Sequence, residues 1–258
     1  MNGAKITAQT IRSMKALGQK VPALTAYDYP MAQLLDAAGI PLLLVGDSLG
    51  MVVLGYPDTT HVTMAEMEHH VRAVARAKPL ALVAADLPYG SYETPEAAVA
   101  NAQRLLVAGA EAVKAEGGQR IRPQIEAIIA AGIPFLGHLG MLPQSILLEG
   151  AYRVKGKLEA EQQTLMADVA LLGSLGAFAI VLELVSAPLA RQLTAQSVIP
   201  TIGIGSGSGC DGQILVVTDL LGTSPGPIPR HVTQRLNFAE QAGQMIKQWK
   251  QSVLGSTP

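Results

Sequence analysis

The stretch AAGIPLLLVGD (37–47) indicates the fold of this chain, because it recurs in closely similar form as AAGIPFLGHLG (130–140). In both copies a helix end is followed by a glycine suited to the left-handed cap, and then by an apolar run of strand length. The stretches AGAEAVKAEG (108–117) and LGAFAIVLE (175–183) follow the same pattern. This weak internal repeat predicts a chain assembled from units of helix, turn and buried strand.

Apolar runs of strand length recur along the whole chain, and longer segments of helical period separate them. Most of the runs are nearly continuously hydrophobic, which is typical of strands buried on both faces of a parallel sheet. Eight such strands with crossover helices favour a (β/α)8 TIM barrel, and a doubly wound open sheet is the alternative. The eight runs cover residues 23–28, 42–47, 80–88, 112–117, 135–140, 177–184, 201–205 and 214–217.

Capping patterns mark the starts of two of the predicted helices. Thr63 is followed three residues later by Glu66, as in a capping box, and Thr94 precedes Pro95 at a first helical position. A further helix is expected within the first twenty residues, before the barrel. The other predicted helices cover residues 30–38, 63–77, 94–108, 120–131, 160–175, 188–194 and 230–254.

The composition narrows the class of protein. Residues 1–258 contain no linker and are expected to form a single domain, in which residues 141–159 are long enough for an active-site lid. A net charge of −1 offers no basic surplus for nucleic acid, and no segment is apolar enough for a membrane span. Cys210 is the only cysteine, which fits a reducing cytoplasm. Only 15% of the residues are charged while 49% are hydrophobic, and this favours a homo-oligomer.

Acidic and basic residues gather at the carboxyl ends of the apolar runs. In a parallel barrel these ends meet at the face that carries chemistry. Each residue alone has a structural reading, as a helix cap, a turn residue or half of an ion pair between Lys114 and Glu116. Together they favour a site, because buried ionised groups are costly unless they are paired or bound to metal. The residues are Asp28, Asp47, Asp86, Lys114, Glu116, His138 and Glu183.

The residue types indicate the chemistry. Asp47, Asp86 and Glu116 form a hard oxygen site, which suits Mg²⁺ better than Zn²⁺. A small 2-oxo acid could chelate such a metal through two oxygens, and the metal would stabilise an enolate. Lys114 adds a positive charge near those oxygens. Glu183 lies among apolar residues, where a desolvated carboxylate is a stronger base.

The glycine-rich stretch GIGSGSG (203–209) follows the seventh predicted strand. Its backbone N–H groups could hold a phosphate or an oxyanion, and a plain glycine-rich turn is an equal alternative. It lacks the lysine of a P-loop and the spacing of a dinucleotide fingerprint.

In these same stretches the chain resembles the ketopantoate hydroxymethyltransferase family. The resemblance implies a (β/α)8 barrel that uses a divalent metal and 5,10-methylenetetrahydrofolate to make ketopantoate from 2-oxoisovalerate, in pantothenate synthesis. It also implies assembly of small-molecule-binding subunits into a decamer. The matching stretches are LTAYDYP (24–30), LLVGDSLGMVVLGY (43–56), VAADLPYGSY (83–92), VKAEGG (113–118), GHLGMLPQS (137–145), FAIVLE (178–183), IPTIGIGSG (199–207) and CDGQILV (210–216).

The resemblance also implies roles for individual residues. Asp47 of VGDSLG and Asp86 of ADLP are similar to metal ligands, and Glu116 of KAEGG is similar to a third carboxylate near the metal. Asp47, Ser48, Asp86 and Lys114 resemble the residues that hold the oxo acid. Glu183 of VLE resembles the proton acceptor.

Two other readings of the sequence stay open. The first is a different metal-dependent 2-oxo acid lyase or mutase on a similar barrel. The second is a barrel that binds or scaffolds without catalysis, and Glu183 in an apolar strand argues against it.

Overall fold

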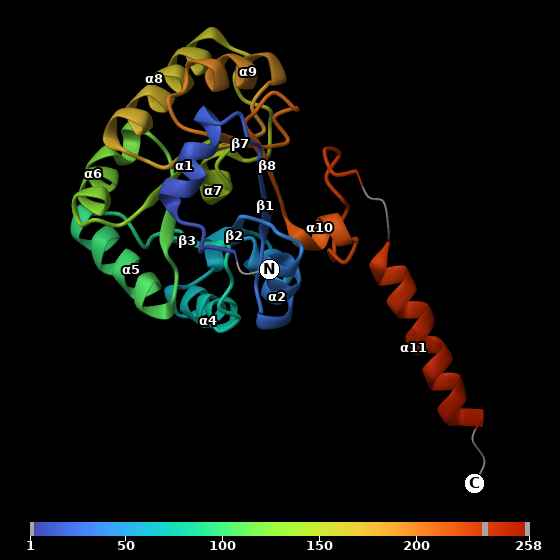
Figure 1. Ribbon diagram of the computed structural model, residues 1–258. Helices are drawn as coiled ribbons and strands as arrows, with labels where there is room; N and C mark the ends of the chain where they lie inside the picture. The colour runs from blue at the N-terminus through green and yellow to red at the C-terminus, as the bar shows by residue number, and fades with distance from the viewer. Residues whose placement is uncertain (1–2, 234–236, 256–258) are drawn as a thin grey trace.

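The computed structural model describes residues 3–233 and 237–255 and contains a closed barrel of parallel strands in sequence order, with β8 paired to β1 (Figure 1). This closure confirms the (β/α)8 barrel and excludes the open sheet. The strands are β1 (Val21–Thr25), β2 (Leu42–Val45), β3 (Leu82–Asp86), β4 (Ala112–Glu116), β5 (Phe135–Gly140), β6 (Ala179–Glu183), β7 (Thr201–Ile204) and β8 (Gly212–Leu215).

Helices surround the barrel and bury their apolar faces on the outside of the strands (Figure 1). The outer helices are α2 (Tyr29–Ala37), α4 (Met64–Ala75), α5 (Pro95–Ala108), α6 (Arg122–Ala130), α8 (Glu159–Leu175), α9 (Ala187–Gln196) and α10 (Val217–Leu221). Short helices lie in the connections: α3 (Leu49–Val52), η1 (Thr59–His61), η2 (Gln119–Ile121), η3 (Pro143–Ser145) and α7 (Ile146–Glu149). The capping residues foreseen at Thr63 and Thr94 cap α4 and α5.

Helix α1 (Ala8–Ala16) precedes the barrel, as expected. Its Ile11 is fully buried and packs with the residues that fill the barrel interior, among them Val21, Leu82 and Phe178 near the starts of their strands. Helix α1 therefore closes the amino-terminal end of the barrel and leaves the carboxyl end for other residues.

Three sequence predictions need correction. The eighth strand starts two residues earlier than expected, because Gly212 and Gln213 are not apolar and were left out of the run. The last helix, α11 (Phe238–Gly255), does not begin at Arg230; a turn lies there, closed by the Val232 N–H donating to the Pro229 carbonyl. The part of that prediction over 234–236 lies outside the described residues.

The third correction concerns Asp28, which does not contribute to the carboxyl face. It is exposed and caps α2, where its side chain accepts from the Met31 N–H at 2.8 Å. An aspartate directly after an apolar run can either cap the next helix or contribute to a site at the carboxyl face, and the sequence does not distinguish these two roles.

Among the described residues, no helix has the length and apolarity that crossing a membrane demands.

Candidate active site

Strand alternation places the site residues. Side chains two apart share one face of a strand, and Leu82, Ala84, Ala112 and Leu136 point into the barrel. Continuing the same alternation to the carboxyl ends brings an inward-facing polar residue to each of four adjacent strands. These residues are Asp86 on β3, Lys114 and Glu116 on β4, His138 on β5 and Glu183 on β6.

Asp47, Asp86 and Lys114 form one connected group at the ends of β2, β3 and β4. Asp86 and Lys114 are opposite each other in the strand register, and Lys114 Nζ lies 2.8 Å from Asp86 Oδ1. The backbone N–H of Asp47 donates to Asp86 Oδ2 at 3.0 Å. The ion pair considered between Lys114 and Glu116 is replaced by this one with Asp86, because register sets the cross-strand partner.

The charges in this group perturb one another strongly. Burial raises the pKa of Asp47 well above its usual range, and the carboxylates of Asp86 and Glu116 raise it further. Burial lowers the pKa of Lys114, but Asp86, Glu116 and Asp47 outweigh this effect and raise it overall. Lys114 is therefore an ammonium at neutral pH, and three carboxyl groups, those of Asp47, Asp86 and Glu116, raise its pKa.

His138 connects this group to Glu183. Its Nε2 lies 3.2 Å from Glu183 Oε2, and its Nδ1 lies 3.5 Å from Glu116 Oε1. Burial and the Lys114 ammonium lower the pKa of His138, but Glu116 and Glu183 raise it to about 9. An imidazolium carries a proton on both nitrogens, so the 3.2 Å between its Nδ1 and Lys114 Nζ is a contact of like charges among the surrounding carboxylates.

The surroundings of Glu183 are only partly apolar, whereas the sequence predicts an apolar environment on all sides. Its neighbours Leu182 and Val185 are buried, as expected for an apolar wall. Its own side chain is 18% exposed and paired with His138. The carboxylate therefore faces the open end of the barrel, where a substrate can reach it.

Ser48 follows Asp47 directly, and its hydroxyl lies 2.9 Å from the Tyr27 hydroxyl. The structure thus brings together Asp47, Ser48, Asp86, Lys114, Glu116, His138 and Glu183, all at the carboxyl ends of strands.

Sequence reasoning missed Gln144, which enters the site from η3. Its side chain is buried and bonded to Asp47, while its backbone N–H donates to Glu116. It stands in the stretch GHLGMLPQS and in the segment expected to be a lid, but nothing in its local sequence shows that it turns inward.

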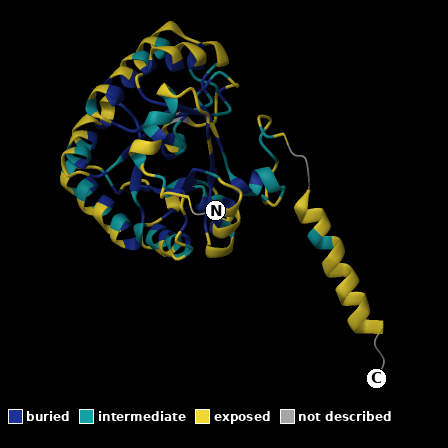
Figure 2. Ribbon diagram, in the orientation of Figure 1, coloured by how far each residue is buried: buried dark blue, intermediate teal, exposed yellow. Residues whose placement is uncertain are grey.

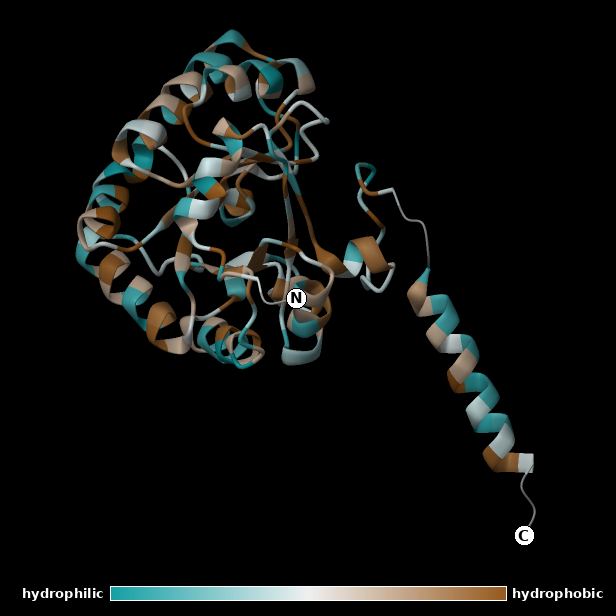
Figure 3. Cartoon of the chain, in the orientation of Figure 1, coloured by the Kyte–Doolittle hydropathy of each residue, from teal (hydrophilic) through white to brown (hydrophobic). Residues whose placement is uncertain are grey.

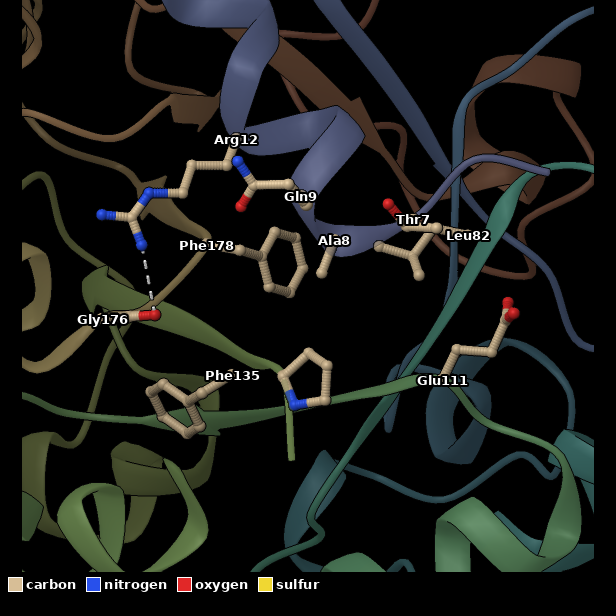
Figure 4. Close-up of a pocket in the computed structure, with 10 residues that line it drawn as sticks. Thr7, Ala8, Gln9, Arg12, Leu82, Glu111, Phe135, Gly176 and Phe178 are labelled. Carbon is tan, nitrogen blue, oxygen red and sulfur yellow. Dashed lines mark hydrogen bonds between the residues drawn. The ribbon is translucent and has the colours of Figure 1, made fainter. Parts of the chain in front are cut away.

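A pocket of about 440 Å³ lies at the opposite end of the barrel (Figure 4). It is lined by α1 and by strand starts such as Leu82 and Phe135, and Arg12 points to the Gly176 carbonyl. None of the clustered carboxylates lines it, so it is separate from the candidate site.

A closed parallel barrel with acids and bases converging at the carboxyl ends of its strands defines an enzyme of the (β/α)8-barrel class. The model of the ketopantoate hydroxymethyltransferase family matches residues 5–257. The chain therefore belongs to the ketopantoate hydroxymethyltransferase family.

Individual relatives support the same family assignment. The 3-methyl-2-oxobutanoate hydroxymethyltransferase of Syntrophus aciditrophicus is 50% identical over 99% of this chain and 94% of its own length. The protein of the same name from Moorella thermoacetica is 51% identical over 97% of this chain and 94% of its own length.

Solved structures share the fold at much lower identity. A phosphonomutase-like protein of Burkholderia cenocepacia matches with a TM-score of 0.68 and 17% identity, over 94% of this chain and 96% of its own. A phosphonopyruvate hydrolase solved with oxalate and Mg²⁺ matches with a TM-score of 0.62 and 13% identity, over 97% of this chain and 99% of its own. Identities this low speak for a common fold alone.

Proposed function

We propose that this chain transfers a hydroxymethyl unit from 5,10-methylenetetrahydrofolate to 3-methyl-2-oxobutanoate (2-oxoisovalerate), giving ketopantoate for pantothenate and coenzyme A synthesis. About 50% identity to enzymes of that name over nearly the whole chain supports the activity. The observation that carries the proposal is the group of buried carboxylates and Lys114 that lies beside Glu183, with His138 between them. We further propose that residues 1–258 act as one catalytic domain in the cytoplasm, where a buried free thiol such as that of Cys210 stays reduced.

The donor set fits a hard divalent cation, and we propose Mg²⁺. Asp47, Asp86 and Glu116 offer carboxylate oxygens, and Glu116 Oε1 has no hydrogen-bond partner among the described residues. Burial raises the pKa of Asp47 and the carboxylates of Asp86 and Glu116 raise it further, and a cation bound beside Asp47 would favour its charged form. Among the described residues, no group of three His, Cys, Asp or Glu side chains is arranged so that it could hold a metal ion by itself. Mg²⁺ typically takes one or two carboxylates and fills its other positions with water and substrate oxygens.

When bound, the metal would act as a Lewis acid toward the oxygens of the oxo acid. The other tasks fall to the protein. Asp47, Ser48, Asp86 and Lys114 would hold the substrate, with the Lys114 ammonium drawing its carboxylate into place. The ion pair with Asp86 fixes Lys114 in a single position for this purpose.

Glu183 would serve as the base that removes the proton from C3. The His138 Nε2 lies 3.2 Å from its carboxylate in an ion pair that would help to orient it. The electron pair left on C3 then forms the new carbon–carbon bond to the one-carbon unit. Both carbon–nitrogen bonds that join this unit to the folate break, water supplies the hydroxyl oxygen of the product, and the C3 proton and one proton of the water go to the two nitrogens of the released tetrahydrofolate.

The test of this function is turnover of 3-methyl-2-oxobutanoate with 5,10-methylenetetrahydrofolate, with and without Mg²⁺. We expect ketopantoate to form only with the divalent ion and to form again when Mg²⁺ is restored after chelation. Full turnover by chelator-treated enzyme would contradict the metal, and no ketopantoate under any condition would contradict the reaction.

We also propose that the enzyme is a homo-oligomer, with a decamer as the form that the family resemblance implies. The low fraction of charged residues supports assembly. So does helix α11, which stands away from the barrel with its apolar side chains exposed (Figures 1 and 2).

A further inference from the structure

Gln144 is the residue of the long connection after β5 that lies deepest in the site. Only 4% of it is exposed, although it belongs to the short helix η3 and not to a strand. Its side-chain Nε2 donates to Asp47 Oδ2 at 2.7 Å and to the Leu87 carbonyl at 2.9 Å. Its Oε1 accepts from the Tyr92 hydroxyl at 2.5 Å.

These contacts permit one orientation of the Gln144 amide. A carboxylate and a backbone carbonyl can only accept hydrogen bonds, so the nitrogen must face Asp47 and Leu87. The Tyr92 hydroxyl then donates to the amide oxygen. An inverted amide would turn its oxygen toward two other acceptors, so Asp47 and Leu87 set which side of the amide faces them, and the Tyr92 hydroxyl holds the amide oxygen on the other side.

The backbone of Gln144 completes the arrangement, because its N–H donates to Glu116 Oε2 at 3.0 Å. One residue thus contacts the ends of β2, β3 and β4, where the three clustered carboxylates lie. It occupies one oxygen of Asp47 and one oxygen of Glu116. The oxygens that Gln144 leaves open are Asp47 Oδ1 and Glu116 Oε1, and the second of these lies 3.5 Å from His138 Nδ1.

We propose that Gln144 is a positioning residue, held by Tyr92, that selects which oxygens of Asp47 and Glu116 face the metal and the oxo acid. This inference rests on the proposed function and assigns to the connection after β5 a part in building the metal site. Gln144 acts through the two carboxylates and need not touch the substrate.

The test replaces Gln144 with methionine, which keeps the size of the side chain and removes the amide. Mg²⁺ affinity is measured by titration calorimetry without either substrate, so the result does not depend on turnover. We expect Gln144→Met to weaken Mg²⁺ binding by about 10- to 100-fold, as loss of a partner that orients a ligand does. The same exchange at Gln192 on outer helix α9, whose amide contacts the Met166 sulfur, should leave Mg²⁺ affinity unchanged.

Tyr92→Phe provides a second route that removes one hydroxyl. It should weaken Mg²⁺ binding in the same direction by about fivefold, the effect of one hydrogen bond. In the Gln144→Met background it should have no further effect, because Tyr92 acts through the amide. If Gln144→Met does not fold, Tyr92→Phe alone still tests the inference.

Three outcomes would overturn the inference: unchanged Mg²⁺ affinity in Gln144→Met, unchanged affinity in Tyr92→Phe, or additive effects of the two. A lower unfolding midpoint with normal Mg²⁺ affinity would make Gln144 a purely structural residue. The Asp47→Asn variant separates this failure from failure of the metal assignment. If Asp47→Asn loses Mg²⁺ and Gln144→Met retains it, only the role of Gln144 is wrong.

Discussion

Glu183 lies where β6 ends in a tight bend, and its neighbours are fixed on both sides. Leu184 has a φ of 48°, a left-handed conformation that is unfavourable for a leucine. The Ser206 hydroxyl accepts from the Val185 N–H at 2.9 Å and donates to the Leu182 carbonyl at 2.7 Å. Such a conformation costs about 1–3 kcal/mol and persists only where surrounding contacts hold it. The bend therefore keeps the Glu183 carboxylate at one place beside His138.

Replacing Glu183 with glutamine separates proton removal from binding. We expect Glu183→Gln to bind Mg²⁺ and 3-methyl-2-oxobutanoate normally, because the amide keeps the size of the side chain. Exchange of the C3 proton in deuterated water should slow by roughly 10²- to 10⁴-fold, the usual contribution of a general base. Proton NMR measures this exchange without any folate, and Glu126→Gln on the exposed face of α6 is the matched control. A mutant that exchanges at the wild-type rate would show that Glu183 is not the base.

Asp47 and Asp86 are both buried, so removing either carboxylate entirely would leave a gap in the site. An isosteric change is therefore the sharper test of the metal site. Asp47→Asn removes one of several crowded negative charges, so the metal-free protein should be as stable as the wild type or more so. Mg²⁺ at 100 times its Kd should stabilise the wild type by about 2.7 kcal/mol and the variant much less. Thermal unfolding with and without Mg²⁺ measures the difference, and equal stabilisation of the two proteins would refute Asp47 as a ligand.

Among the elements, α1 lies outside the repeated pattern of strand and helix, yet it completes the core. Its Ile11 is fully buried against the strand residues that fill the barrel interior. Lys15 on the same helix forms an ion pair with Asp211 at 2.6 Å, next to the start of β8. Helix α1 is thus attached both through the barrel interior and through a surface contact.

Truncating Ile11 should destabilise the whole fold. We expect Ile11→Ala to lower the free energy of unfolding by about 2–5 kcal/mol, the range for large-to-small changes in a core. Leu17→Ala, at the exposed carboxyl end of the same helix, should change it by less than about 0.5 kcal/mol. Urea denaturation compares the two variants. Equal effects would mean that α1 does not close the barrel as a packed element.

The sequence predicts the regular elements well, for a physical reason. Strands buried on both faces are nearly continuous apolar runs, and a polar residue at their inward-facing ends stands out. The short helices α3 and α7 were not foreseen, because four residues carry too little periodicity. The partner of Lys114 and the inward turn of Gln144 depend on register and on contacts between segments 28 or more residues apart. Such contacts leave no local pattern in the sequence.

At the scale of the whole molecule, the outer layer of helices is thinnest beside β8 and β1. The helix that follows β8 is α10, with five residues, whereas α2, which follows β1, has nine. Pro22 on β1 and Gln213 on β8 are exposed, while strands β2 to β6 have no exposed residue. The next helix along the chain, α11, does not cover this region and extends away from the barrel (Figure 1).

Helix α11 has an apolar stripe that is not buried within its own chain. Phe238, Met245, Ile246, Trp249 and Val253 recur at helical spacing, and all are at least half exposed (Figure 2). Brown and teal segments alternate along α11 in Figure 3, as expected for an amphipathic helix. Burying one large apolar side chain stabilises by about 1.5–3 kcal/mol, so a second copy of the chain that covers this stripe would gain substantially.

A charge placed on the apolar stripe of α11 should therefore break the assembly. We expect the wild type to form a large homo-oligomer at micromolar concentration and Trp249→Glu to form smaller species, because an unpaired carboxylate buried in an apolar interface is costly. Gln251→Glu adds the same charge on the opposite side of the helix and should leave the assembly intact. Light scattering and sedimentation velocity resolve these forms against a subunit mass of 27.0 kDa. A monomeric wild type would reject the oligomer, whereas a Trp249→Glu variant that keeps the full assembly would place the interface elsewhere on the barrel.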